Sequence, residues 1–269
     1  MSVFSPRMAL VSIAAALAIP ATASAQMAMD ATWSFRLGAY FPNIDTKARA
    51  DSTSGAVGTS IDFESDLGLA STKTLPVFDA QWRFAPNHRL ELGYLDLSRT
   101  GNTTLTANIE WEGQTFSRST QVRGEFDSKI TSLTYLYSFY RTPATELSAG
   151  VGLFYTKIDA GISNQGTLAV DRSVSANAPL PVIALRAEQR FAEQWKGELR
   201  YQWFGVKVGD YDGSLNVFNA AVAYYPWKNW GVEAGYNYSR YDLKVSREAW
   251  TGEAKYQFHG PVLALVASF

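Results

Sequence analysis

The 269-residue chain contains no cysteine and only two histidines, His88 and His259. Disulfide scaffolds, thiolate metal sites and cysteine nucleophiles are therefore excluded, as is a metal site built from several histidines. Charged residues make up 18% of the chain, against a usual share of about 25%. Lys and Arg number 24 against 25 Asp and Glu, so the chain lacks the basic surface of a polyanion binder. We expect no nucleic-acid partner, no metal and no cofactor.

The sequence also lacks an apolar run long enough to cross a membrane as a helix. The longest, Met8 to Ile19, falls short of the roughly 20 residues required. It follows Arg7 and precedes Pro20 and the small residues Ala23-Ser24-Ala25, which is the pattern of a secretory signal peptide. We predict a cleaved signal peptide over residues 1–25 and one domain over 26–269. The alternative is a buried N-terminal helix.

From Trp33 onward, apolar and polar residues alternate with period two, and no segment of the mature chain has helical periodicity. The pattern predicts an all-β fold, a closed antiparallel up-and-down barrel of ten strands, with eight or twelve as alternatives. The ten predicted strands are Trp33–Phe41, Thr74–Phe84, Arg89–Leu97 with its polar continuation, Phe126–Arg141, Glu146–Lys157, Leu180–Phe191, Trp195–Val208, Leu215–Tyr225, Trp230–Val245 and about Glu253–Phe269.

The connections between these strands alternate in length. Every second connection is three to five residues long, whereas the others range from short to more than 20 residues. Outer-membrane barrels have tight periplasmic turns and longer extracellular loops, and a β-sandwich has no reason to segregate its loops in this way. The lengths therefore favour a transmembrane barrel in a Gram-negative outer membrane.

The aromatic residues decide which strand face meets lipid. They cluster beside the short turns and again about eight residues away, a span of about 21 Å for a tilted strand, close to the roughly 25 Å apolar band of such barrels. We therefore expect the apolar face to point outward. The alternative is the aromatic end of an ordinary soluble β core. The predicted membrane-interface aromatics are Trp82, Phe84, Phe191, Trp195, Trp203, Trp227, Trp230, Tyr236 and Tyr238.

With the apolar face outward, the opposite face lines the lumen. Five cationic and five acidic side chains then face one another, and long complementary side chains can satisfy each other inside a closed barrel. We predict a lumen that this charge network fills and blocks. Its predicted members are Asp79, Arg83, Glu91, Arg186, Glu188, Arg190, Lys196, Glu198, Arg200 and Glu233.

The C-terminal segment adds a family resemblance. Tyr256-Gln257-Phe258 and the alternating run from Val262 to Phe269 resemble the last strand of outer-membrane barrels. The layout over most of the mature chain is similar to the OmpA and OmpW superfamily, with ten strands where those proteins have eight. The resemblance implies that Phe269 is the signal read by the barrel-assembly machinery. We expect a bulge at Gly260-Pro261 that keeps Phe258 and Leu263 both facing lipid.

The candidates for chemistry are few. The segment Ile61–Leu69 carries alternating carboxylates, but its spacing does not match a calcium loop, and we expect a solvated, strand-like loop. His259 is expected to face inward near the outer rim and is the weak candidate for catalysis, while His88 is expected to be solvated in a turn. The sequence has neither the serine that outer-membrane lipid A deacylases place after the histidine nor the acidic pairs of the omptin proteases. We predict that the protein is not an enzyme.

Two segments extend beyond the membrane. A hairpin through Thr103–Thr120, turning at Glu112-Gly113, is expected to project from the cell surface, and Ile158–Pro179 is expected to be an exposed, mobile loop.

We predict a structural or surface-interaction barrel that contacts outer-membrane lipid and lipopolysaccharide, with its extracellular ligand left open. The alternatives are a narrow porin-like channel for small solutes, an outer-membrane lipid hydrolase acting through His259, and a secreted soluble β protein.

Overall fold

The computed structural model describes residues 30–52, 58–164, 171–208, 211–246 and 250–269, and the predicted signal peptide lies outside them. No helix among these residues has the length and apolarity to cross a membrane. The strands are β1 (Trp33–Tyr40), β2 (Asn43–Ser52), β3 (Ile61–Asp62), β4 (Leu75–Ala85), β5 (His88–Thr104), β6 (Ile109–Trp111), β7 (Gln114–Phe116), β8 (Gln121–Arg141), β9 (Thr145–Asn164), β10 (Asp171–Ala192), β11 (Trp195–Val208), β12 (Tyr211–Tyr224), β13 (Trp230–Ser246) and β14 (Trp250–Ser268).

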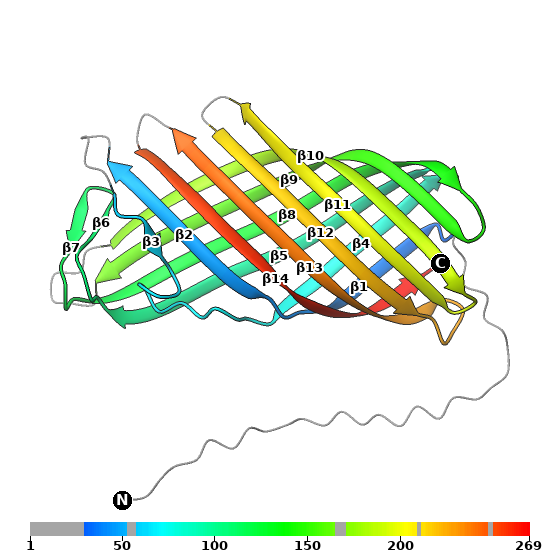
Figure 1. Ribbon diagram of the computed structural model, residues 1–269, viewed down its shortest axis with the longest axis horizontal. Coiled ribbons are helices and arrows are strands. Elements are labelled where there is room, and N and C mark those ends of the chain that lie inside the picture. Colours follow the sequence, from blue (N-terminus) through cyan, green and yellow to red (C-terminus); the bar gives the residue numbers. More distant parts are fainter. Residues whose placement is uncertain (1–29, 53–57, 165–170, 209–210, 247–249) are drawn as a thin grey trace, which may run out of the picture.

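Ten of these strands form a closed antiparallel barrel, as the sequence predicts. Their order is β1-β4-β5-β8-β9-β10-β11-β12-β13-β14, and β14 pairs with β1 to complete the ring. Figure 1 shows an elongated barrel with strongly tilted strands. Trp33 at the start of β1 pairs with Phe269 at the same end as the four short turns. We call this end the terminus end and the opposite one the loop end.

The first barrel strand is split. β1 lies between β14 and β4, whereas β2 continues along β14 in the same register and leaves β4 behind. The division falls at Phe41-Pro42, where proline removes one backbone donor. Beyond it, the chain segment before β4 covers the free edge of β2 through the short strand β3. The alternation analysis missed β2 because its residues are mostly small or charged.

Side chains point alternately into and out of the barrel along the whole of each strand. The polarity of the inner and outer faces, however, reverses between the terminus end and the loop end. On β8 near the terminus end, Leu133 is half exposed on the outer wall while Thr134 is buried inside. Nearer the loop end, Lys129 points outward and Phe126 is fully buried in the interior. The wall is therefore apolar in one zone and charged in the next, which fits a strand that leaves lipid for water.

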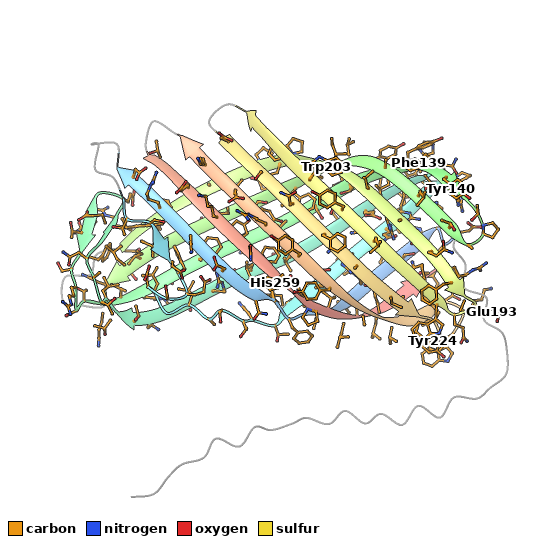
Figure 2. The ribbon with its side chains drawn as sticks, viewed as in Figure 1. Phe139, Tyr140, Glu193, Trp203, Tyr224 and His259 are labelled. Atoms are coloured by element: carbon orange, nitrogen blue, oxygen red, sulfur yellow. The ribbon has the colours of Figure 1, made fainter. Side chains whose placement is uncertain are left out.

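Three β-bulges lie beside the short turns at the terminus end. Each inserts one unpaired residue between ladder partners, and in each case that residue is a phenylalanine, Phe84, Phe139 or Phe191. A bulge re-aims side chains locally, so Phe139 and its neighbour Tyr140 are both exposed on the outer wall (Figure 2). The bulges thereby enrich the aromatic rim at this end.

The predicted bulge at Gly260-Pro261 is wrong. The registers of β14 with β13, β1 and β2 run through this point without a shift. Phe258 therefore faces the interior and is 2% exposed, whereas Leu263 faces outward. The interruption is instead at Phe41-Pro42, between β1 and β2, which lie next to β14. The backbone N–H of Phe41 donates to the carbonyl oxygen of Pro261.

The segment expected as a long loop, Ile158–Pro179, is mostly strand. β9 runs to Asn164 and β10 begins at Asp171, so these strands extend well past the apolar zone. In the other predicted extension, the turn lies at Glu112-Gly113 as expected, and both residues adopt positive φ. This hairpin, β6 with β7, lies at the loop end (Figure 1), and its apolar side chains are buried.

Candidate functional site in the barrel interior

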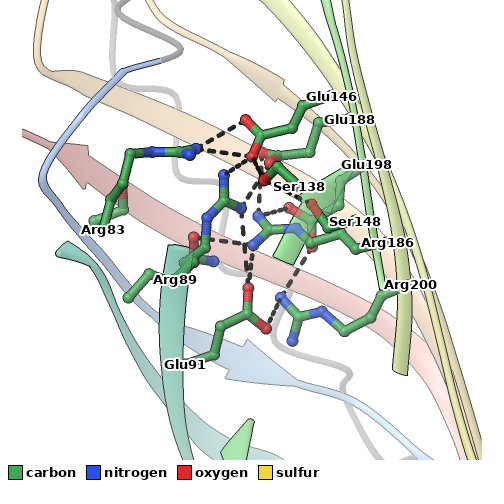
Figure 3. A network of polar contacts seen from close by, with 12 residues as sticks. Arg83, Arg89, Glu91, Ser138, Glu146, Ser148, Arg186, Glu188, Glu198 and Arg200 are labelled. Atoms are coloured by element: carbon green, nitrogen blue, oxygen red, sulfur yellow. Dashed lines mark hydrogen bonds and ion pairs between the residues drawn. The ribbon is translucent and has the colours of Figure 1, made fainter. Parts of the chain in front are cut away.

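The interior near the terminus end is filled by paired charges, which we call the charged layer (Figure 3). It contains six cations and six carboxylates from seven strands. Each strand supplies these groups on its inward face, because every second side chain points into the lumen. The members are Arg36, Asp79, Arg83, Arg89, Glu91, Glu146, Arg186, Glu188, Lys196, Glu198, Arg200 and Glu233.

Arg186 lies at the centre of the charged layer. Its Nη2 contacts Glu198 at 2.7 Å and Glu188 at 3.1 Å, and its Nη1 donates to Glu91. Its side chain is 1% exposed. A buried charge without partners is strongly destabilising, so the three carboxylates and the guanidinium depend on one another.

A chain of pairs extends from this centre toward the terminus end. Arg89 donates to Glu188 at 2.7 Å and to Glu146 at 3.1 Å. Arg83 donates to the same Glu146 at 2.8 Å, and the Ser138 hydroxyl donates to it as well. Each carboxylate therefore receives several charge-assisted hydrogen bonds, the strong class of such bonds.

A second group of charges lies on the other side of the lumen. Arg36 donates from Nε to Asp79 at 2.7 Å and from Nη1 to Glu233 at 3.0 Å. No ion pair among the described residues joins this group to the Arg186 group. The charged layer therefore has two parts that share no ion pair: one cation with two carboxylates around Arg36, and five cations with four carboxylates around Arg186.

Nine of the ten predicted lumen charges belong to the charged layer. The exception is Arg190, which lies at the bulge that ends β10 and has no ion-pair partner among the described residues. The prediction missed Arg36, Arg89 and Glu146. Arg89 and Glu146 are the first charged residues after short turns. Each lies two residues before an inward-facing side chain, Glu91 or Ser148, and this spacing is the signal that identifies them as inward-facing.

The interior near the loop end is apolar, and we call it the apolar core. Segment 61–69 enters it with four buried side chains, so the expectation of a solvated loop there is wrong for that face. Phe63 packs edge-on against Trp111 of β6 and against Phe126 of β8. Burial raises the pKa of Tyr241 and of Tyr256 above the usual tyrosine range, so both phenols stay neutral in this core.

Arg99 fixes segment 61–69 against the barrel wall. It pairs with Glu64 and donates to the carbonyl oxygen of Ala70 at 2.9 Å, and its guanidinium lies over the ring of Phe126. Glu64 also accepts the backbone N–H of Thr46 at 2.8 Å. This buried arginine therefore holds β2, β5 and the segment between them together.

The predicted interface aromatics lie on the outer wall. Trp82, Phe84, Phe191, Trp195, Trp227, Trp230 and Tyr236 are exposed, and Trp203 and Tyr238 are partly exposed. Phe269 is exposed beside them and packs edge-on against Trp230, with ring centroids 5.9 Å apart. Trp203 and Tyr224 mark the two levels in Figure 2.

Neither histidine lies in the interior, which corrects the expected inward position of His259. His259 is on the outer face of β14, where its Nδ1 is 2.7 Å from the hydroxyl of Tyr236 (Figure 2). His88 begins β5 rather than lying solvated in a turn, and its Nδ1 is 2.7 Å from the hydroxyl of Tyr135. No cluster of three metal-ligating side chains occurs among the described residues.

Among the hollows in the interior, three share lining residues with one another. The first is at the terminus end and shares Ser34, Gln81 and Lys196 with the second. The second shares Arg36 and Arg200 with the third, a central cavity of about 100 Å³. These three hollows thus pass between the two parts of the charged layer and reach the underside of the apolar core, which contains a separate hollow of about 30 Å³ lined by Trp111, Ile158 and Leu243.

Comparison with solved structures assigns the fold. The outer membrane protease OmpT from Escherichia coli matches with a TM-score of 0.55 at 13% identity, over 92% of this chain and 100% of OmpT. The fold is that of an outer-membrane β-barrel. OprG from Pseudomonas aeruginosa (TM-score 0.38, 8% identity, 89% of this chain and 97% of that one) and Ail from Yersinia pestis (0.36, 9%, 88% and 99%) also match. No protein-family model matches the sequence, and neither does any curated protein.

The likeness to OmpT is one of fold. In this outer-membrane barrel both histidines point away from the lumen and have tyrosine partners. A hydrolytic site needs a base next to a nucleophile or an activated water, and the outward position of His259 does not supply one in the interior.

Proposed function

We propose that the protein is an integral barrel of the Gram-negative outer membrane with a closed lumen and a structural or surface-interaction role. The observation that carries the proposal is the pair of successive barriers inside the barrel. The charged layer occupies the interior on the terminus side, and the apolar core with segment 61–69 occupies the loop side. Only small hollows pass the charged layer, and a hydrated ion would then have to disrupt the apolar core.

The proposal includes an orientation and partners. With ten strands, both termini and the short turns face the periplasm, and the loop end with the β6–β7 hairpin faces the exterior. The outer wall contacts lipid between the two aromatic levels and lipopolysaccharide above them. The exposed Phe269 is the proposed contact for the barrel-assembly machinery during insertion.

The closed lumen predicts electrical silence. Purified, refolded protein added to a planar lipid bilayer should give no stepwise conductance, because the apolar core leaves no continuous aqueous path beyond the hollows of the charged layer. Folding is verified first by the shift in gel mobility between heated and unheated samples. A general porin at the same protein concentration provides the positive control.

The narrow-channel alternative has one observation in its favour, the row of hollows that reaches the centre from the terminus end. It predicts discrete conductance steps whose size changes in Arg200→Ala, since Arg200 borders two of the hollows. Conductance steps that change in Arg200→Ala would contradict the closed lumen. Steps that this substitution leaves unchanged would come from another protein in the sample.

A further inference from the structure

The central cavity has two chemically different sides. Toward the loop end it is covered by an aromatic roof formed by Tyr40, Tyr241 and Phe258, whose rings lie 5.8 to 6.2 Å apart in the pairs Tyr241–Phe258 and Tyr40–Phe258. Toward the terminus end it is bounded by polar side chains, including Gln202 and Asn219. An apolar surface facing a few placed polar groups is the usual composition of a small-molecule site.

The charged side chains that border this cavity already form ion pairs. Arg36 is neutralised by Asp79 and Glu233, and Arg200 contacts Glu198 at 3.0 Å and Glu91 at 3.5 Å. A charged ligand would have to compete with these pairs and lose its own hydration, which is costly in an enclosed site. The cavity therefore favours a ligand without net charge.

The neutral polar groups around the cavity are uncommitted. The side chains of Asn219, Asn237 and Ser239 line it, and none makes a hydrogen bond to another described residue. Ser239 is only 5% exposed. Asn219 and Asn237 are partly buried beside it. A buried hydroxyl without a partner is unfavourable, so Ser239 requires either water or a ligand, and the two amides add donors and acceptors next to it.

Access to the cavity is from one side. The two outer hollows lead to it from the terminus end, whereas Tyr256 stacks on Tyr241 at 4.6 Å above the roof and the apolar core continues beyond. These two hollows measure about 20 and 30 Å³, room for a few waters. A ligand therefore enters from the side of the termini as the side chains that line them move apart. In the proposed orientation of the barrel, this side is the periplasm.

We infer that the central cavity binds a small neutral polyol that enters from the terminus end. Hydroxyl groups of a polyol match the donors and acceptors of Asn219, Asn237 and Ser239. Its C–H face packs against the aromatic roof, as apolar faces do on aromatic rings. Arg36 and Arg200 are each paired with two carboxylates, so neither guanidinium is free to bind an anion of the same size.

The test uses the refolded mature chain in deuterated detergent micelles and saturation-transfer difference NMR. Glycerol, ribose and myo-inositol are the probes, and acetate and methylammonium are the charged controls. We expect transfer to at least one polyol and none to either ion. Asn219→Leu should weaken polyol binding about tenfold, the loss expected when a buried hydrogen-bond partner is removed.

Asn216→Leu is the matched control, because Asn216 lies on the same strand but faces outward. It should bind polyol like the unmodified chain. Ser239→Val provides a second interior variant if Asn219→Leu does not fold. Absence of transfer to all three polyols in the folded chain, stronger transfer to acetate or methylammonium, or equal binding in interior and control variants would overturn the inference. Because binding is read without a bilayer, it is independent of the conductance result.

Discussion

Replacing Arg186 by alanine is expected to destabilise the barrel by about 3–5 kcal/mol, the cost of removing one partner from a buried ion pair. The substitution leaves Glu91, Glu188 and Glu198 facing one another without the guanidinium that joins them. Equilibrium unfolding in urea, followed by tryptophan fluorescence in lipid vesicles, measures the loss. The triple change Arg186→Met with Glu91→Gln and Glu198→Gln should recover much of it, because the uncompensated charge is reduced together with the cation.

The matched control for this experiment is Arg240→Ala. Arg240 forms an ion pair with Asp242 at 3.0 Å on the outer wall, where its side chain is 53% exposed. Exposed pairs contribute little to stability, so this variant should unfold almost as the unmodified chain does. Equal effects of Arg186→Ala and Arg240→Ala would mean that the charged layer is hydrated in solution.

The second large effect is expected on the lipid-facing wall. Leu199 is 52% exposed on β11, halfway between Trp195 and Trp203, which belong to the two aromatic levels. Leu199→Arg should therefore destabilise the barrel by about 2–4 kcal/mol, the cost of an arginine at the bilayer midplane. The same unfolding measurement in vesicles reports it.

The control for Leu199→Arg is the same substitution at a position nearer the membrane surface. Phe191 is also exposed on the outer wall but lies in the bulge at the terminus end, so Phe191→Arg should cost about 0–1 kcal/mol from its charge near the interface. If both arginines have the same effect, the wall between the aromatic levels does not face hydrocarbon. A detergent-free, soluble Leu199→Arg variant would contradict the account in the same way.

The part of the fold within the membrane is encoded strongly in the sequence. Along β11 the residues Leu199 and Tyr201 alternate with Glu198 and Arg200, and a one-residue shift would reverse both faces. Strand alternation, turn spacing and aromatic levels therefore agree, and together they predict ten strands and the outward apolar face.

The part beyond the membrane was predicted less well because a single polarity rule does not hold there. In water the wall must be polar and the interior apolar, which is the reverse of the arrangement in lipid. Phe258 and Trp111 are buried inside for that reason, although their hydrophobicity alone favoured a lipid-facing or projecting position. β2, with Ala48 and Ala50 inward and charges outward, gives too weak a contrast to be recognised as a strand.

The candidate site was predicted in composition but not in connectivity. The alternation of side chains along β10 places Arg186 and Glu188 inside. The pairing of each carboxylate with a guanidinium, however, depends on the register of strands on opposite sides of the lumen. The bonds of Arg89 to Glu146 and Glu188 join residues 57 and 99 positions apart. The uncommitted amides of the central cavity give no sequence signal, since a lone asparagine in a strand looks the same whether or not it has a partner.

The central claim is that each strand keeps its alternation while the chemistry of its two faces inverts at the membrane boundary. Because the chain has no cysteine, a spin label can be placed at each position from 125 to 136 of β8 in vesicles. Odd positions from 131 to 135 should be accessible to oxygen, odd positions from 125 to 129 to a water-soluble nickel complex, and even positions to neither. Oxygen accessibility that peaks at even positions, or that continues unchanged to residue 125, would contradict the claim.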